Sequence, residues 1–230
     1  FKFLLIARVV ASCATQKRSN TIVHSSHAAL KFESLSRYDE KRLLADKNSA
    51  LKLCYQGKYD EAIESFNAKL DQNINNYSYW NEIGTCYILQ ERYSQAKRFF
   101  DIALSNAKKK RHKAVIINNL GVILLKLDNN ELAKEYFKKS IKLSKGALTP
   151  KFNLAKIYLR YSNYSAADEL IKSLLKSSTQ DIDFLHLYGH SLLMQKKYEL
   201  PLMYYDKIPK QYHLPDGIGS NIEKAHYLVV

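Results

Sequence analysis

The chain has 230 residues, long enough for one extended domain or two small ones, and its 36 Lys and Arg exceed its 22 Asp and Glu by 14. With only 7 Gly and 4 Pro, the composition excludes a collagenous chain, a disordered chain and a turn-rich β-sandwich or barrel. The positive charge is compatible with nucleic acid, anionic lipid or an acidic protein as partner, and charge alone does not distinguish these. The three cysteines are odd in number and contain no CxxC pair, so they predict neither a closed disulfide framework nor a zinc site.

The N-terminal segment 1–13 reads FKFLLIARVVASC, with a cation near its start, an apolar stretch and small residues before a cysteine. It resembles a bacterial lipoprotein signal, whose motif of an aliphatic residue, two small residues and Cys is matched by residues 10–13. The resemblance implies a signal over 1–12, lipidation of Cys13 and a solvated tether to residue 36. The apolar run is too short to span a bilayer, which takes about 20 apolar residues. Arg8 interrupts it, so an apolar N-terminus of a cytosolic protein is the alternative.

Self-similarity at a regular interval runs through most of the remaining chain. Five segments share one pattern: KYDEAIESF (58–66), RYSQAKRFF (92–100), NNELAKEYF (129–137), NYSAADELI (163–171) and KYELPLMYY (197–205). Their central positions are occupied by Ala62, Ala96, Ala133, Ala167 and Pro201, at successive spacings of 34, 37, 34 and 34. This pattern resembles the tetratricopeptide repeat family, whose unit is a helix, a turn and a second helix in about 34 residues.

The resemblance implies an all-α, right-handed superhelical solenoid over 37–230, with a concave surface lined by the first helix of each unit. The predicted repeats are 43–76, 77–110, 114–147, 148–181 and 182–215, followed by a capping helix over 221–230. Close helix crossing explains the small residues: we expect those at 84, 121, 155 and 189 on the first helices to face the small residues of the second helices. The one spacing of 37 places a three-residue insertion at the basic run 108–113.

The family's groove positions, carried onto this chain, predict a partner-binding groove. It comprises Asn81, Asn118, Asn119, Val122, Phe152, Asn153, Lys156, His186 and His190. Asn offers both a donor and an acceptor, so the four asparagines are predicted to form a ladder that grips the backbone of an extended peptide. The alternative is that they satisfy helix ends or water. No three consecutive units reproduce the family's Lys and Asn clamp for chaperone tails, so that partner is not predicted.

A basic loop is predicted between the second and third repeats, formed by Lys108, Lys109, Lys110, Arg111 and Lys113. It is either a solvated loop or a docking site for an acidic partner or anionic head groups. Nucleic acid is not predicted, because basic residues interleaved with stacking aromatic residues are absent.

Motifs for nucleotide binding, zinc proteolysis and serine hydrolysis are all absent. The sequence therefore predicts a protein that is not an enzyme and needs no cofactor or metal. One cluster keeps an enzyme hypothesis open: Asp183, His186 and His190 share one face of a predicted helix and have side chains that bind divalent ions. The other interpretation is that these are solvated or peptide-contacting groove residues.

Together these features predict a non-catalytic scaffold that binds a partner peptide or protein in the concave groove. A lipoprotein signal followed by such repeats resembles the bacterial pilotins that help to assemble the type IV pilus secretin. That resemblance implies a lipid-anchored assembly factor of the outer membrane, facing the periplasm. The alternative is a cytoplasmic regulatory adaptor for a signalling protein.

Overall fold

A computed structural model describes residues 49–210 and 220–229, and both parts are helical without strands, as the repeat pattern predicted. The first helices of the five units are α3 (Ala50–Tyr55), α6 (Tyr77–Leu89), α8 (Lys110–Lys126), α10 (Leu148–Arg160) and α12 (Ile182–Met194). The second helices are α4 (Tyr59–Asn67), α7 (Tyr93–Asn106), α9 (Asn130–Leu143), α11 (Tyr164–Ser177) and α13 (Glu199–Tyr205). Two further helices are α5 (Leu70–Asn73), which leads into the second unit, and α14 (Ser220–Val229). The predicted signal, Cys13 and the tether lie outside the described residues.

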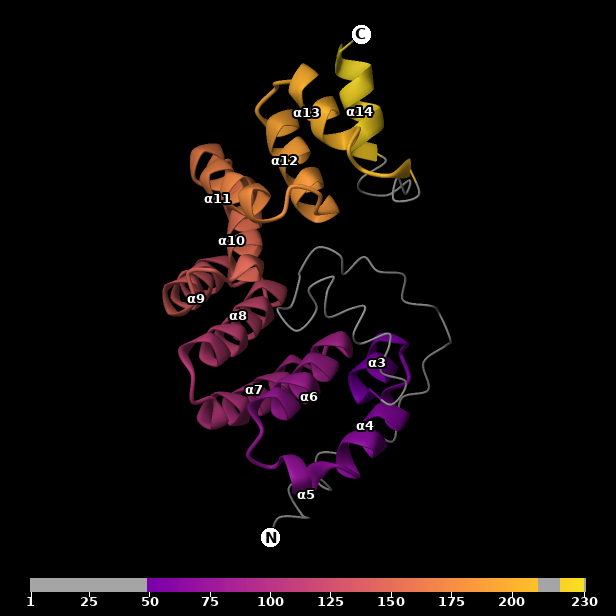
Figure 1. Ribbon diagram of the computed structural model, residues 1–230, viewed down its shortest axis with the longest axis vertical. Coiled ribbons are helices and arrows are strands. Elements are labelled where there is room, and N and C mark those ends of the chain that lie inside the picture. The colour runs from indigo at the N-terminus through magenta and orange to yellow at the C-terminus, as the bar shows by residue number, and fades with distance from the viewer. Residues whose placement is uncertain (1–48, 211–219, 230) are drawn as a thin grey trace.

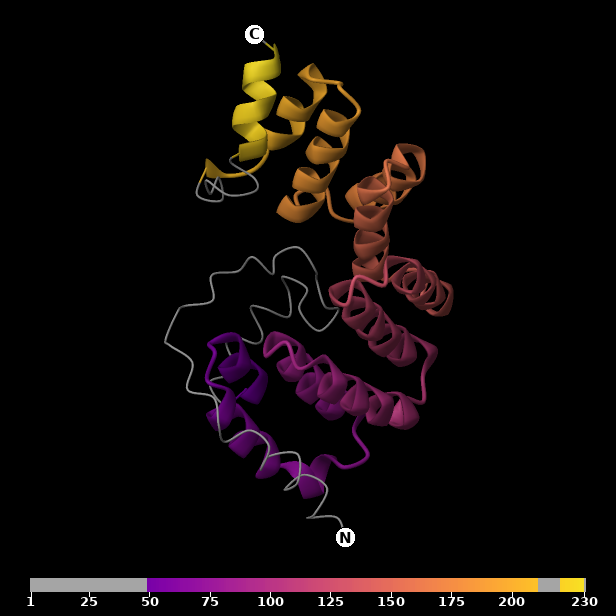
Figure 2. The same ribbon diagram turned by 180° about the vertical axis from the view of Figure 1, so that it is seen from behind.

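The helix pairs stack into an arc. Each first helix packs on the second helix of its own unit, and from the second unit onward each second helix also packs on the first helix of the next unit. Figure 1 shows the arc from α3 at one end to α14 at the other, and Figure 2 shows it from behind. No unit buries its apolar face alone, so the core lies between neighbouring units, as expected for a helical solenoid. It forms three clusters of buried residues that share partly buried side chains such as Tyr158 and Leu175.

The turn between the two helices of each unit has the same backbone conformation. One residue in each turn has a positive φ: Gly57 (76°), Glu91 (59°), Asp128 (59°), Ser162 (56°) and Lys196 (59°). The N–H of the next residue donates to the carbonyl five residues earlier, for example Asn163 to Tyr158 at 2.8 Å. This left-handed ending satisfies carbonyls that the helix leaves unpaired. Four of the five turns adopt it without glycine, so each carries a conformational cost.

The two helices of a unit cross closely at the small residues of the first helix, as predicted. The residues of the second helix that these small residues contact differ from those expected. A Cβ atom added to Gly84 would lie 2.6 Å from the Phe100 ring, and one added to Gly121 would lie 2.7 Å from the Phe137 ring. The nearest atoms across the crossing are therefore those of an aromatic ring rather than of a second small residue. The expectation of small facing small was wrong, because the aromatic residue lies one helical turn further along the second helix.

The three-residue insertion lengthens a helix instead of a loop. α8 has 17 residues whereas α6, α10 and α12 have 13 each, and it begins at Lys110 rather than at the predicted residue 114. Three or four residues make about one helical turn, so the extra turn absorbs the insertion without changing the register of the stack. Only Lys108 and Lys109 precede the helix, so the prediction of a basic loop over 108–113 was wrong in that respect.

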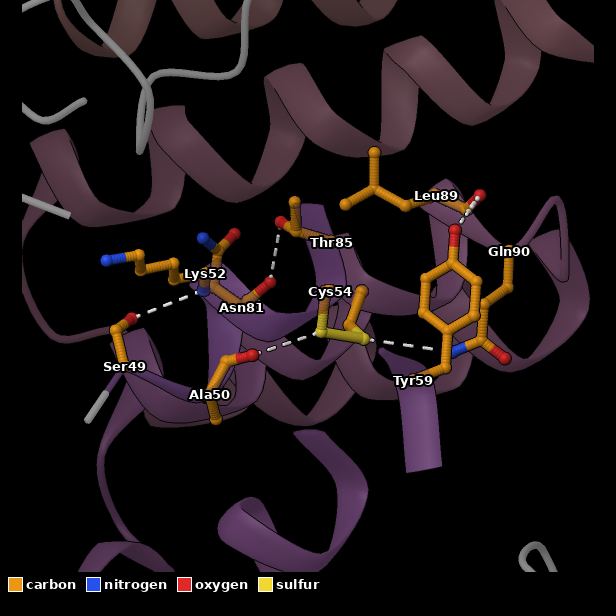
Figure 3. Close-up of a disulfide and its surroundings, with 10 residues drawn as sticks. Ser49, Ala50, Lys52, Cys54, Tyr59, Asn81, Thr85, Leu89 and Gln90 are labelled. Carbon is orange, nitrogen blue, oxygen red and sulfur yellow. Dashed lines mark hydrogen bonds between the residues drawn. A yellow bond between two sulfur atoms is a disulfide. The ribbon is translucent and has the colours of Figure 1, made fainter. Parts of the chain in front are cut away.

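A disulfide joins the first unit to the second, which the odd number of cysteines had argued against. Cys54 of α3 and Cys86 of α6 are bonded, with their Cα atoms 5.4 Å apart, and both residues are buried. Figure 3 shows the bond between the two helices, beside the Tyr59 hydroxyl that donates to the Leu89 carbonyl at 3.1 Å. The short helices α3 and α4 are thus held to the stack by a covalent link as well as by packing.

The C-terminal end of the stack is covered by α14, close to the predicted capping helix at 221–230. Ala225 of this helix is fully buried, and with Ile222 it packs against a cluster that includes Tyr205 and Ile208. Pro201 lies in the first turn of α13, where the lack of an N–H costs little.

Candidate functional site

The four asparagines bond to one another across three consecutive units, instead of lining the groove as the predicted ladder that grips a peptide backbone. Asn153 Nδ2 donates to Asn118 Oδ1 at 3.0 Å, Asn118 Nδ2 to Asn119 Oδ1 at 3.1 Å, and Asn119 Nδ2 to Asn81 Oδ1 at 2.9 Å. All four side chains are buried, with at most 2% of their surface exposed. Their amide groups therefore connect α6, α8 and α10 inside the stack.

Buried amides of this kind fix the register of neighbouring units, because a shifted unit would leave each of them without a partner. Val122 and Phe152, two further residues of the predicted groove, are also buried, with 0% and 4% exposure. Six of the nine predicted groove residues thus lie between repeats. The other three, Lys156, His186 and His190, are partly exposed.

These three residues cluster on the first helices of the fourth and fifth units. Lys156 and His190 lie one repeat apart and occupy equivalent positions on α10 and α12, while His186 lies one turn before His190. The rings of the two histidines are 6.5 Å apart. Asn221 of α14 reaches the same place, with its Nδ2 atom 2.9 Å from His186 Nε2.

Burial dominates the electrostatics of this cluster. Burial lowers the pKa of His186 to about 4. The neighbouring His190 and Lys156 also lower this pKa, whereas Asp183 raises it. Burial also lowers the pKa of His190. The pKa of Lys156 falls to about 8, mainly through burial, with Lys126 and Arg160 contributing and Asp183 opposing. The histidines are therefore neutral at pH 7, and Lys156 is poised to gain from a nearby negative charge.

Three buried polar atoms in this region have no hydrogen-bond partner among the described residues. They are Oδ1 of Asn153, at the end of the amide chain, Nδ1 of His190, and the hydroxyl of Tyr205, whose ring lies 6.1 Å from that of His186. Asn153 lies one helical turn before Lys156 on α10. Buried polar atoms are rarely left unpaired, so each is a candidate to bond to an added group.

Metal binding by Asp183, His186 and His190 receives no support from the geometry. Among the described residues, no group of three or more His, Cys, Asp or Glu side chains is placed to hold an ion. The part of the chain that the structure describes also contains no helix with the length and apolarity needed to cross a bilayer.

The predicted basic residues all lie at the surface. Lys108, Lys109, Lys110, Arg111 and Lys113 are exposed at the start of α8. Between them, His112 stacks on Tyr77 of α6, with the rings 4.1 Å apart and inclined by 14°. This contact fixes the first turn of α8 against the second unit and leaves the five cations exposed to solvent.

Stacked helix pairs with this turn, this crossing and this spacing define a helical-repeat scaffold of the tetratricopeptide type. The sequence signature of the tetratricopeptide repeat family matches residues 75–146, which overlap the second and third predicted units. The fold class is confirmed over the described helices.

Comparison with known proteins agrees with this assignment. The protein ycf37 of Cyanophora paradoxa is 35% identical over 80 residues, which are 34% of this chain and 46% of that protein. The chain thus aligns with less than half of that relative's length. A solved structure of Pseudomonas aeruginosa PilF matches with a TM-score of 0.62 at 19% identity, over 82% of this chain and 86% of the other. PilW, described as a widely conserved type IV pilus biogenesis factor, matches with a TM-score of 0.62 at 18% identity, over 84% and 88%. At these identities the structural matches establish the fold alone.

Proposed function

We propose that this protein is a non-catalytic scaffold of the bacterial envelope that binds a segment of a partner protein on the first helices of its fourth and fifth repeats. The observation that carries the binding site is the pair of buried, unpartnered atoms, Asn153 Oδ1 and His190 Nδ1, beside the partly exposed Lys156. Asn153 is fully buried, so a bound segment contacts the partly exposed Lys156 and His190 rather than the Asn153 oxygen itself. Because the other asparagines are bonded to one another, the site is confined to this half of the stack.

The chemistry of the site favours a segment with an acidic group. The Lys156 ammonium is desolvated, and the nearby cations Lys126 and Arg160 lower its pKa further. A carboxylate next to Lys156 would reverse that effect, since an opposite charge favours the charged form of a buried group. The neutral histidines beside it offer a ring face and a ring nitrogen rather than a second positive charge.

The disulfide supports an envelope location. Disulfides persist in oxidising compartments such as the bacterial periplasm and are rare in the cytosol. The bond between Cys54 and Cys86 therefore fits a protein that is exported, as the predicted signal and Cys13 require. PilW, which shares the fold, is described as a type IV pilus biogenesis factor, and the proposed role in envelope assembly is compatible with that likeness.

Two experiments test the two parts of this proposal separately. For the anchor, wild type and Cys13→Ala are labelled with an alkyne analogue of palmitate, and we expect the label and the membrane fraction only in wild type. An unlabelled wild type contradicts lipidation.

For the site, capture of a partner from native membranes is compared for wild type, Lys156→Ala and the control Lys172→Ala on the exposed face of α11. We expect capture to fall about tenfold or more for Lys156→Ala alone, because buried charged contacts contribute at least about 1.5 kcal/mol. Equal capture by all three contradicts the site.

A further inference from the structure

A row of basic residues follows one edge of the solenoid, at the junctions where one unit passes to the next. The junctions after α7, α9 and α11 all lie at the same end of the helix pairs, because each leads from a second helix to the next first helix. Eight cations occupy these junctions and all are exposed: Lys108, Lys109, Lys110, Arg111, Lys113, Lys142, Lys145 and Lys176. We call this set the basic edge. Both views of the molecule show the α7–α8 junction at the outer margin of the arc (Figures 1 and 2).

Acidic residues are missing from the first two junctions. The sequence contains no Asp or Glu between Asp101 and Asp128, and none between Glu135 and Asp168. The ion pairs of the described residues lie elsewhere, for example between Lys97 and Asp101, and none involves the basic edge. At the third junction, Asp181 uses its carboxylate to accept from the backbone at the start of α12. Among residues 49–210 and 220–229, the positive charge of the edge therefore has no ion-pair partner.

The edge also lacks an exposed apolar patch or a free aromatic ring face, because His112 and Tyr77 are partly buried and stack on each other. The exposed large hydrophobic residues among those described lie in other places, as Leu127 and Tyr161 do in the turns within units. A protein interface needs an apolar centre surrounded by polar residues, and single-stranded nucleic acid needs aromatic rings on which bases stack. Neither feature is present here. What the edge offers is a line of long, exposed cations.

We propose that the basic edge docks the protein on an anionic membrane surface, with phosphate-bearing lipid head groups as the ligand. Basic residues near such a surface each add to the attraction without needing fixed contact geometry, which suits exposed lysines spread over several repeats. This inference is independent of Cys13 and of the partner site. It predicts that the solenoid lies with this edge toward the membrane and leaves α10 and α12 accessible.

The test is sedimentation of the full chain, with Cys13→Ala in the wild type and in every variant so that no lipid anchor contributes, with vesicles of phosphatidylcholine, with or without phosphatidylglycerol. One variant replaces the basic run at the start of α8 with Lys108→Gln, Lys109→Gln, Lys110→Gln, Arg111→Gln and Lys113→Gln. A control removes five other exposed cations, with Lys97→Gln, Arg98→Gln, Lys138→Gln, Lys196→Gln and Lys197→Gln. Both variants keep the N-terminal segment and have the same net charge, so they differ in the position of the removed cations and in the loss, in the control, of the Lys97–Asp101 and Lys138–Glu135 ion pairs.

We expect the wild type to sediment with the anionic vesicles only, and the binding to disappear at about 0.5 M salt because exposed charges are screened. The basic-run variant should bind at least about tenfold more weakly, while the control stays within about twofold of wild type. A second variant, Lys142→Gln with Lys145→Gln, should weaken binding by a smaller factor and shows whether the edge extends beyond α8. Equal losses in the basic-run and control variants, binding to neutral vesicles, or tighter binding to a random DNA duplex than to anionic vesicles would each overturn the proposal.

Discussion

Substitution of Gly121 by Ala tests the account of how the two helices of a unit pack. A Cβ atom at this position would lie 2.7 Å from Phe137 Cε1, 3.0 Å from Cδ1 and 3.2 Å from Tyr136 Cβ. Optimal contacts between carbon atoms are about 3.5–4.0 Å, so the helices must separate or the ring must move. Phe137 is fully buried, so its ring cannot move without displacing its neighbours. Overpacking of this kind costs about 1–3 kcal/mol, against which Ala gains about 1 kcal/mol in helix propensity over Gly.

The expected result is a net loss of up to about 2 kcal/mol in the free energy of unfolding, which is a fall of a few degrees in Tm for about 150–250 residues. The protein itself suggests the rescue. In the fourth unit the equivalent positions carry Ala155 and Ile171, both fully buried, in place of glycine and an aromatic residue. Adding Phe137→Ile to Gly121→Ala should therefore restore part of the loss, although Phe137→Ile alone leaves a cavity and is destabilising.

Thermal unfolding followed by circular dichroism measures all four members of this double-mutant cycle. We expect a favourable coupling of at least about 0.5 kcal/mol between the two sites. Gly146→Ala is the matched control, because no atom lies within 4 Å of a Cβ atom at that position. If Gly121→Ala stabilises the protein as much as the control does, the close crossing is not a determinant of packing and the reasoning is refuted.

Three further predictions concern the turns, the disulfide and the histidines. Ser162→Gly relieves a positive φ of 56° and should raise the free energy of unfolding by about 1 kcal/mol in a denaturant titration, whereas a glycine inside a helix is destabilising. Replacing Cys54 and Cys86 by Ser opens a link with a sequence separation of 32 and should cost about 3–4 kcal/mol, measured against wild type with and without reductant. Burial holds the pKa of His186 near 4, below its ordinary 6.5, so stability should fall as the pH drops from about 6.5 to 4, by up to about 3 kcal/mol.

Each of these has an outcome that contradicts it. A loss of stability in Ser162→Gly would mean that the turn gains more from its side chain than the backbone conformation costs. An unchanged midpoint for the cysteine variant, or no effect of reductant on wild type, would remove the covalent link from the account of the first unit. For His186, the variant His186→Gln should have a flatter pH profile than wild type, and parallel profiles would assign the acid sensitivity to other groups.

The repeat pattern predicted most of the fold because it reflects contacts that every unit makes in the same way. Residues 62, 96, 133 and 167 fixed the register, and all four positions carry fully buried alanines of the second helices. Features that vary between units were harder to predict. The positive-φ residues are Gly, Glu, Asp, Ser and Lys, so no residue type marks the position, although their spacing of 34, 37, 34 and 34 repeats that of the alanines.

The disulfide and the chain of asparagine hydrogen bonds both depend on how neighbouring units stack. That stacking cannot be predicted from the positions of residues within a single unit. Cys54 and Cys86 have a sequence separation of 32, short of one full repeat, so they occupy different positions in their units and come together only because α3 packs beside α6. Asn118 was predicted to line the groove, but it is buried between repeats. Its burial follows from the amides of Asn119 and Asn153, which bond to it from its own and the next unit.

Site-specific photo-crosslinking in native membranes tests the proposed partner site most directly. A photoreactive amino acid replaces either His190 on α12, whose own Nδ1 atom is the unpartnered nitrogen, or Lys172 on the exposed face of α11. The proposal predicts one discrete crosslinked protein from position 190 and none from position 172, with the crosslink reduced when Lys156→Ala is added. Crosslinks of equal yield from both positions, or from position 172 alone, would contradict a partner site on the first helices of the fourth and fifth repeats.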